Sequence, residues 1–315
     1  MISLKNTPSL VVHGGINMDV IGITQTIPES GQTVVGQESF FSAGGKGANQ
    51  SVAIARLGAK VSLIGVVGKD YFGPILLEGL QKEGVDISAI STDQNINSGL
   101  AIILLDSERE NRILVIPGAN LNQSNLEFGS IESKISKSSY VLLQGEIDQN
   151  ASIKTAETAR KHAVKVVLDP APAENISKEL LNSSDIITPN QAEASSITGI
   201  GVIDVQSAKE ACEALLGFGP SVAITTIGDM GAYYISSSGE QGHINAFKTD
   251  VVDSVAAGDA FNGSLTVSLA NGTTLQQAVH NAVAAGSLAT TVKGAQRSMP
   301  TADQVKNLIA KGKHS

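Results

Sequence analysis

The sequence predicts an α/β fold with a mostly parallel central sheet that is covered by helices on both faces. Short apolar runs alternate with helical patterns along most of the 315 residues, as in chains of βαβ units. Two β-rich stretches, within about 20–42 and 98–117, interrupt this alternation and carry no helical period. We therefore expect residues 1–315 to form a single domain with a small inserted β-sheet.

The expected strands are short and apolar, and the expected helices carry a hydrophobic period of about 3.6 residues. After the last strand of the series, the pattern indicates a hairpin that ends near Ile235. The strands are expected at 10–13, 60–66, 140–144, 165–169, 185–188 and 221–226. The helices are expected at 49–57, 72–83, 152–163, 206–217, 259–270, 275–290 and 302–311.

The inserted sheet is expected to be antiparallel. Two β-rich runs, 99–106 and 111–117, flank a charged AspSerGluArgGlu turn at 106–110. A small sheet of this kind cannot bury both of its faces by itself. We therefore expect it to act as a lid over the α/β body, as a dimer surface, or as both.

Composition excludes several classes of function. The 22 basic and 30 acidic side chains give a net charge of −8, which argues against a basic nucleic-acid or membrane surface. Aromatic residues make up 3% and Trp is absent, so stacking platforms for single strands are not expected. The single cysteine, Cys212, lies in a helical pattern typical of a buried thiol. No transmembrane run or signal peptide is recognised, and a cytoplasmic location is expected.

Two common nucleotide motifs are absent from the sequence. None of the Gly-Lys pairs is followed by Ser or Thr, as a Walker A loop requires. The run Gly45-Lys46-Gly47 continues with Ala48-Asn49-Gln50, so the dinucleotide fingerprint also fails. Neither a P-loop NTPase nor an ordinary nicotinamide dehydrogenase is supported.

The segment 253–263 is the strongest candidate for chemistry. Small residues there precede a helix expected to begin near Gly258, whose free N–H groups would attract an anion. The amides near Ala257, Gly258 and Asp259 could hold a phosphoryl group, and the Asp259 carboxylate could accept a hydroxyl proton. The alternative is an aspartate that only stabilises the start of the helix.

Other polar segments follow expected strands or open expected helices. The glycine-rich run 43–50 would bring backbone close to a ligand and project Asn49, unless it is simply a flexible turn. Asn17 and Asp19 could bind polyol hydroxyls, or could form a turn or cap. Glu146 likewise ends a strand. Asn190 and Glu193 could organise hydrated Mg²⁺ beside phosphates, although the pair also matches a capping box.

The segments 44–50 and 253–263 resemble the two signatures of PfkB-type carbohydrate kinases, in a form closest to the ribokinases. Matching segments occur in the family's order at 16–19, 117–120, 169–173, 188–193 and 293–296. The resemblance covers about residues 10–300. It implies a ribokinase-like three-layer sandwich with a β-sheet lid that often forms the homodimer contact. It also implies ATP-dependent phosphorylation of a sugar hydroxyl, O5 of D-ribose in the ribokinase case.

The resemblance also implies roles for individual residues. Asp259 resembles the catalytic base, and Ala256, Ala257 and Gly258 resemble the anion hole. The sugar contacts correspond to Asn17, Asp19, Gly45, Lys46, Asn49 and Glu146, together with Asp259. The nucleotide contacts correspond to Asn190, Thr226, Gly228, Gly231, Gly258 and Val283. Asn190 and Glu193 match the motif that positions Mg²⁺ through water. A K⁺ site is implied at Asp253, Val255, Ala289, Val292, Gly294 and Ser298.

The sequence departs from the family pattern at two of the matched positions. Gly15 stands where many ribokinases have Ser, and Val292 stands where a basic residue is common. Three other interpretations stay open. A related kinase could act on deoxyribose, fructose or adenosine, although the scarcity of aromatic residues disfavours a nucleoside. A non-catalytic sugar sensor would not need Asp259, and a dehydrogenase would need the missing fingerprint.

Overall fold

The computed structural model describes residues 7–107 and 111–312 and contains two β-sheets. The large sheet has nine strands in the order β13-β12-β11-β10-β9-β8-β1-β4-β5. Seven are mutually parallel, and β12 and β13 are added antiparallel at one edge. The strands are β1 (Ser9–His13), β4 (Lys60–Gly68), β5 (Asp86–Asp93), β8 (Tyr140–Gln144), β9 (Lys165–Asp169), β10 (Ile186–Ile187), β11 (Val222–Thr226), β12 (Ala232–Ser236) and β13 (Gln241–Ile244).

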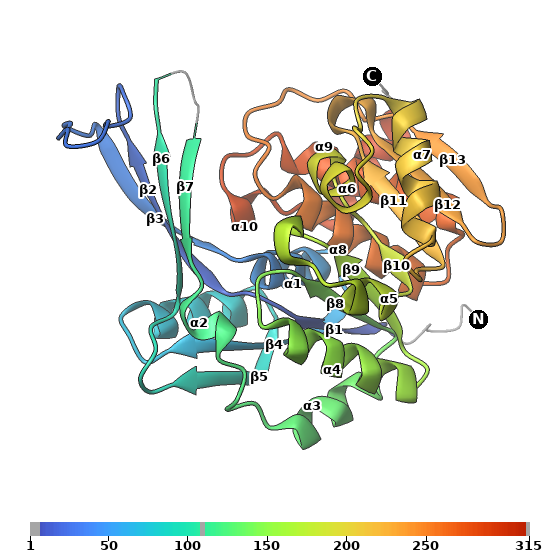
Figure 1. Ribbon diagram of the computed structural model, residues 1–315, viewed down its shortest axis with the longest axis horizontal. Coiled ribbons are helices and arrows are strands. Elements are labelled where there is room, and N and C mark those ends of the chain that lie inside the picture. Colours follow the sequence, from blue (N-terminus) through green and yellow to red (C-terminus); the bar gives the residue numbers. More distant parts are fainter. Residues whose placement is uncertain (1–6, 108–110, 313–315) are drawn as a thin grey trace.

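Helices cover both faces of this sheet, which gives the expected three layers (Figure 1). One layer contains α1 (Lys46–Arg56), α2 (Phe72–Lys82), α8 (Ala257–Ala270), α9 (Leu275–Ala289), α10 (Ala295–Ser298) and α11 (Ala302–Lys311). The other contains α3 (Phe128–Ile135), α4 (Gln149–Lys161), α5 (Lys178–Asn182), α6 (Gln191–Thr198) and α7 (Val205–Leu216). Short 3₁₀ turns lie at Gly118–Leu121, Ala173–Asn175 and Gly228–Met230.

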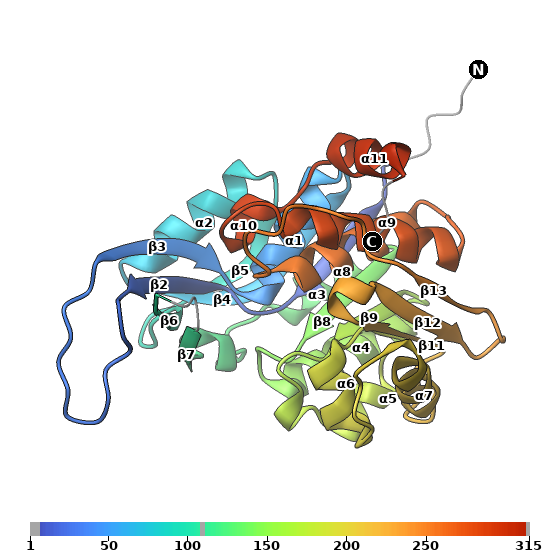
Figure 2. The ribbon, with the colours of Figure 1, turned by 90° about the horizontal axis from the view of Figure 1, so that it is seen from above.

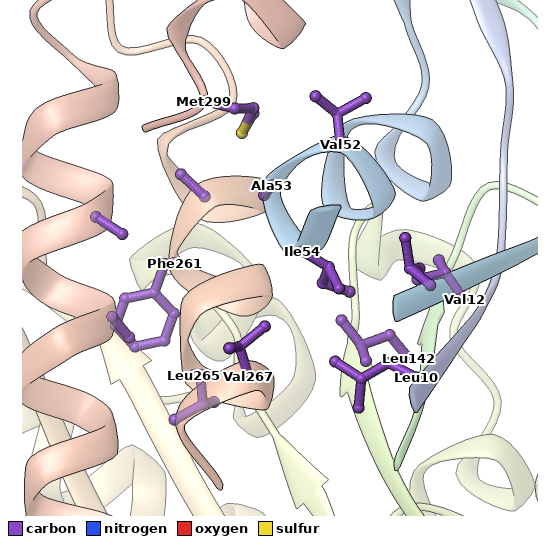
Figure 3. Close-up of a cluster of buried hydrophobic side chains, with 14 of the residues drawn as sticks. Leu10, Val12, Val52, Ala53, Ile54, Leu142, Phe261, Leu265, Val267 and Met299 are labelled. Carbon is purple, nitrogen blue, oxygen red and sulfur yellow. The ribbon is translucent and has the colours of Figure 1, made fainter. Parts of the chain in front are cut away.

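Alternate side chains of the strands build two separate hydrophobic cores. On β1, Leu10 and Val12 face the α1 and α8 layer, whereas Val11 faces the α4 layer. Figure 3 shows Leu10, Val12 and Leu142 meeting Ile54 of α1, with Phe261 and Leu265 of α8 alongside. Because a buried parallel strand must be apolar on both faces, these strands appear in the sequence as continuous hydrophobic runs. Cys212 is fully buried in the second core, as its pattern indicated.

The small sheet, which we call the lid sheet, projects from one end of the body (Figures 1 and 2). Its strand order is β3-β2-β6-β7, from β2 (Asn17–Ile23), β3 (Glu38–Gly44), β6 (Gly99–Leu105) and β7 (Asn111–Ile116). The prediction of an antiparallel sheet was wrong at its centre, where β2 and β6 are parallel. Strands β2 and β6 leave the body side by side in the same direction. The chain then returns through β3, which is antiparallel to β2, and through β7, which is antiparallel to β6.

Several boundaries also differ from the expected ones. The lid strands extend to residues 17 and 44, beyond the expected 20–42, because Asn17 and Asp19 lie in β2 rather than in a turn. Helix α1 begins at Lys46, three residues before the apolar period that predicted it. Positions 108–110 of the expected charged turn, and the N-terminal residues 1–6, lie outside the described residues. No helix within 7–107 and 111–312 has both the length and the apolar character needed to cross a bilayer.

Candidate active site

The candidate site lies where the order of the parallel strands reverses. After β1 the chain adds β4 on one side of it and later returns to place β8 on the other side. In open α/β sheets, ligands bind at such a switch point, outside the carboxyl ends of the strands. The segments that follow β1, β8, β9, β10 and β11 therefore form one continuous row along this edge of the sheet.

A glycine-rich contact joins the end of β1 to the start of α1. Gly45 has φ 88°, and a Cβ there would lie 2.6 Å from Gly15 O and 2.7 Å from Asn17 N. The Ala48 amide donates to Gly15 O at 3.1 Å. Positive φ and this close approach both require glycine at position 45. The loop thus brings two backbone segments together and directs the first turn of α1 toward the switch point.

Asp259 lies in the first turn of α8, next to α1. Its side chain is 4% exposed. Asn49 Nδ2 donates to its Oδ2 at 2.9 Å and Gln50 Nε2 donates to its Oδ1 at 3.1 Å. Ala256 precedes the helix with φ 62° and makes no side-chain cap. The Ala257 N–H donates to Ser254 O at 3.3 Å, whereas the Gly258 and Asp259 amides lie in the first turn, where N–H groups have no partner within the helix.

Burial, together with the nearby Asp169 carboxylate, raises the pKa of Asp259 to about 6. Lys46 and the Asn49 and Gln50 amides act in the opposite direction, because they stabilise the carboxylate. The carboxyl therefore titrates close to neutrality. A group with such a pKa can accept a proton from a hydroxyl at neutral pH and release it readily.

Lys46 lies among carboxylates from three different parts of the chain: Glu146 after β8, Asp169 at the end of β9 and Asp259 in α8. Its backbone N–H donates to Glu146 Oε2 at 2.7 Å, and its Nζ lies 3.5 Å from Asp169 Oδ2. Burial lowers the pKa of Lys46, but Asp169, Asp259, Glu146 and other carboxylates outweigh it and raise the pKa above its usual value. Burial raises the pKa of Glu146 to about 7, although Lys46 opposes the shift. The ammonium group is thus a permanent positive charge in this acidic pocket.

Asn17 and Asp19 are two residues apart on β2 and therefore lie on the same face of the lid sheet. Asn120 Nδ2 donates to Asn17 Oδ1 at 2.7 Å, which orients the amide. Burial, and then the charge of Asp259, raise the pKa of Asp19 to about 7. Within the described residues, the buried Asn49 Oδ1 has no hydrogen-bond partner. We call this group of predicted residues, Asn17, Asp19, Gly45, Lys46, Asn49, Glu146 and Asp259, the polar end of the site.

A cavity of about 420 Å³ lies beyond the start of α8. Five predicted nucleotide residues line it, namely Thr226, Gly228, Gly231, Gly258 and Val283. Gly231 has φ 92°, and a Cβ there would lie 2.6 Å from Ala246 N. We call this region the cavity end of the site. Asp229, Ser254 and Phe261 lie in predicted segments without an individual role. The other residues that line the cavity, apart from Ala257, were not predicted: Ala246, Phe247, Lys248, Thr249, Val251, Gly286, Ser287 and Thr290.

Asn190 is not among the residues that line this cavity. It forms a capping box at the start of α6, with Asn190 Oδ1 accepting from the Glu193 amide at 2.9 Å. The Glu193 carboxylate accepts in turn from Asn190 N at 2.8 Å and Asn190 Nδ2 at 2.8 Å. Burial and the Asp169 charge raise the pKa of Glu193. The pair therefore caps a helix and also lies within the electrostatic reach of the polar end.

Two loops that carry the predicted K⁺ positions are joined through Asp253. Its Oδ1 accepts from Val255 N and its Oδ2 from Gly294 N, both at 3.0 Å. Both Val252 N and Asp253 N donate to Thr290 O. The predicted positions Ala289, Val292 and Ser298 belong to the α9–α10 side of this junction. Backbone carbonyls, one carboxylate and one hydroxyl are oxygen donors of the kind that hard cations prefer.

Three buried polar residues of the site were missed as candidates. Gln50 bonds to Asp169 and to Asp259, and Gln144 bonds to Gln50. Asp169 belongs to the quoted segment 169–173, but no role was assigned to it. His13 was expected to be packed, and it is fully buried against Thr155 and Gln123. For Gln50, the signal available in the sequence was a polar amide next to Asn49 at the start of a helix whose following residues are mostly apolar.

The model of the pfkB carbohydrate kinase family matches residues 7–302. The ribokinase of Haemophilus influenzae is 38% identical over 301 residues, which are 96% of this chain and 98% of that protein. The ribokinase of Schizosaccharomyces pombe is 36% identical, over 93% of this chain and 95% of its own length.

Solved structures share the same fold. The ribokinase of Arabidopsis thaliana, whose structure contains ribose and ATP, superposes with a TM-score of 0.90. The two chains are 29% identical, and the superposition covers 96% of this chain and 99% of the other.

Proposed function

The chain belongs to the pfkB family of carbohydrate kinases, and we propose that it transfers the γ-phosphoryl group of ATP to the 5-hydroxyl of D-ribose. One observation carries this proposal. The Asp259 carboxylate lies at a helix start, with the polar end on one side and the cavity end on the other. A base between a hydroxyl-binding pocket and an anion-binding helix start is the arrangement that phosphoryl transfer to an alcohol requires.

In this proposal the polar end binds the sugar. Asn17 and Asp19, with Glu146 opposite, supply acceptors for ribose hydroxyls, and the free Asn49 Oδ1 supplies another. Gly45 lets the sugar approach the backbone. The Lys46 ammonium balances the carboxylates and attracts the transferred phosphoryl group. Ribose carries several closely spaced hydroxyls on its ring. A group of directional hydrogen-bond acceptors therefore suits it better than an apolar pocket would.

Asp259 acts as the general base in the proposed reaction. Its carboxylate takes the proton of the 5-hydroxyl as that oxygen attacks the γ-phosphorus, and ADP leaves from the opposite side. The amides of Ala257 and Gly258, preceded by the left-handed Ala256, stabilise the charge on the transferring oxygens. Losing one such donor in other enzymes costs about 3–4 kcal/mol in the transition state. The nucleotide lies in the cavity end, against Thr226, Gly228, Gly231 and Val283.

Two metal ions are part of the proposal. Glu193 and Asn190 would hold Mg²⁺ through water, and their carboxylate and amide oxygens are ligands of the type Mg²⁺ prefers. K⁺ would be held at Asp253, Val255, Ala289, Val292, Gly294 and Ser298. The Asp253 hydrogen bonds hold these two loops together, and their carbonyl, carboxylate and hydroxyl oxygens are ligands of the kind that a hard cation prefers. Bound there, the cations would supply positive charge near the phosphates. Neither departure from the family pattern, Gly15 or Val292, removes a side-chain ligand.

The remaining expectations concern assembly and location. We propose one α/β domain with the lid sheet as an insertion, a homodimer that forms through the lid sheet, and a cytoplasmic location. Large apolar side chains support the dimer, since Phe41 is 63% exposed and Leu114 is 59% exposed. Covering such a surface by a second copy would remove apolar area from water.

A coupled ADP-release assay over pentoses and hexoses, with Mg²⁺ and K⁺ present, tests the function. We expect turnover to be highest with D-ribose, to rise with K⁺, and to fall sharply in Asp259→Asn. Strong turnover of deoxyribose or fructose without ribose turnover would replace the substrate and keep the mechanism. Ribose binding without any ADP release would instead indicate a sugar sensor.

A further inference from the structure

Gln50 is a fully buried amide at the centre of the site, where the sugar and nucleotide contacts of the proposed reaction give it no role. It lies on α1, beside Asn49 and one turn after Lys46. Its Nε2 donates both to Asp169 Oδ2 at 2.9 Å and to Asp259 Oδ1 at 3.1 Å. A single NH₂ group therefore bridges two carboxylates that come from different layers of the fold.

The orientation of this amide is determined by its other end. Gln144, the last residue of β8, donates from Nε2 to Gln50 Oε1 at 2.7 Å. An amide whose oxygen accepts a hydrogen bond must present its NH₂ group on the opposite side. The two hydrogens of Gln50 Nε2 are therefore directed at Asp169 and Asp259. If the Gln50 amide were turned over, its oxygen would face the Asp169 and Asp259 carboxylates, and its NH₂ group would face the NH₂ group of Gln144.

The carboxylate of Asp259 is held at both of its oxygens by this arrangement. Asn49 Nδ2 binds Oδ2 and Gln50 Nε2 binds Oδ1, so neither rotation nor displacement is free. With both hydrogen bonds in place, the carboxylate can still accept a proton from a substrate hydroxyl. From these contacts we propose that Gln50 is a positioning residue, which fixes the catalytic base Asp259 and ties it to Asp169. This inference rests on the proposed kinase function.

The charges around Asp259 show why such a donor is needed. Asp169, Glu146, Asp19 and Glu193 are the carboxylates that face this region, and Lys46 is the cation that faces them. Gln50 donates to Asp169 and to Asp259 without adding charge. Without it, Asp169 and Asp259 would repel each other across the vacated space, and Asp259 would retain its proton to a higher pH.

The test compares wild type with Gln50→Met and Gln50→Glu, using kcat and kcat/KM from pH 5 to 9. In Gln50→Met we expect kcat to fall by about 10- to 100-fold, the loss typical of a hydrogen bond to a charged group. We expect the acid limb of kcat to move up by about 0.5–1 pH unit, with the KM for ATP nearly unchanged. Gln50→Glu keeps the shape but adds a third acid, and it should move the acid limb further in the same direction.

Ser51→Ala is the matched control, because Ser51 is the next residue of α1, is equally buried, and bonds only to Gly47 O among the described contacts. It should leave the pH profile unchanged. Thermal unfolding shows which variants fold, and Gln50→Glu carries the test if Gln50→Met does not. An unshifted acid limb in folded Gln50 variants would overturn the positioning role while wild-type turnover still supports the kinase. No turnover of any sugar by wild type would overturn both proposals.

Discussion

The two ends of the site bind by different means. At the polar end most of the groups are side chains; Asn17, Asn49 and Asp259 are buried, and Asp19, Lys46 and Glu146 are half-buried. Most of them have hydrogen-bond partners in the protein before any ligand arrives. At the cavity end, glycines, small residues and apolar side chains such as Val283 form an open hollow.

This difference follows from the ligands that the two ends are proposed to take. Sugar hydroxyls differ only in direction, so selecting among them requires acceptors that are held in place. Phosphates and a flat base can be held by backbone amides and apolar contact. This arrangement costs folding free energy at the polar end, where burial keeps several carboxylates close to one another. The predictions that follow test this contrast.

The largest effect is expected from Asp259→Asn. The amide keeps the size of the carboxylate but cannot take the hydroxyl proton, so kcat should fall by about 10²- to 10⁴-fold. ATP binding, measured by calorimetry, should change little because the cavity end is intact. A kcat within twofold of wild type would show that Asp259 is not the base.

A smaller effect is expected from Gly45→Ala at the polar end. The new Cβ would press on Gly15 O and Asn17 N at a residue with φ 88°. We expect kcat/KM for the sugar to fall on the order of 10- to 100-fold, since backbone strain of this kind costs about 1–3 kcal/mol. Gly58→Ala is the control, because Gly58 has φ 87° with open space around it. Equal losses in both variants would contradict a role for the close approach.

Gly231→Ala tests the cavity end in the same way. Gly231 and Gly239 both have φ 92°, but only at Gly231 would a Cβ meet the backbone near Ala246. We expect Gly231→Ala to raise the KM for ATP by about 10-fold, equivalent to about 1.4 kcal/mol, and to leave the sugar KM unchanged. Gly239→Ala should alter neither constant. A change in the sugar KM would show that the two ends are not independent.

The smallest effect concerns stability without ligands. Because the pKa of Asp259 is raised to about 6, the folded state binds more protons than the unfolded state between about pH 4 and 6. The contribution of Asp259 to the free energy of unfolding is therefore fully present below its unfolded pKa and is lost as pH rises through about 6. Relative to wild type, Asp259→Asn should gain on the order of 2 kcal/mol between pH 4 and 8.

Denaturant unfolding of both proteins at several pH values measures this difference. His13 acts in the opposite direction, since burial lowers its pKa to about 4 and its contribution is lost in acid. That contribution is common to the two proteins and cancels in the comparison. A stability difference that does not vary with pH would contradict the electrostatic cost assigned to the polar end.

Much of the fold could be predicted because buried parallel strands and amphipathic helices leave local patterns. The family likeness and the α/β fold are confirmed, and most strand and helix boundaries agree within a few residues. The parallel pairing of β2 with β6 could not be predicted, since nothing within either strand specifies which distant segment lies beside it. The same holds for Gln50, whose importance depends on Asp169 and Gln144, both remote in sequence.

The parallel pairing of β2 and β6 has a consequence for the order of folding. Asn17 lies opposite Gly99 in this pair, so forming it closes a long loop that contains β3, α1, β4, α2 and β5. The residues that line the cavity all come from the segment 226–290, and their contacts close much shorter loops. In refolding experiments, protection of amide hydrogens around the cavity should therefore precede protection of the β2–β6 amides. The ability to bind sugar would then be the last property that the chain acquires.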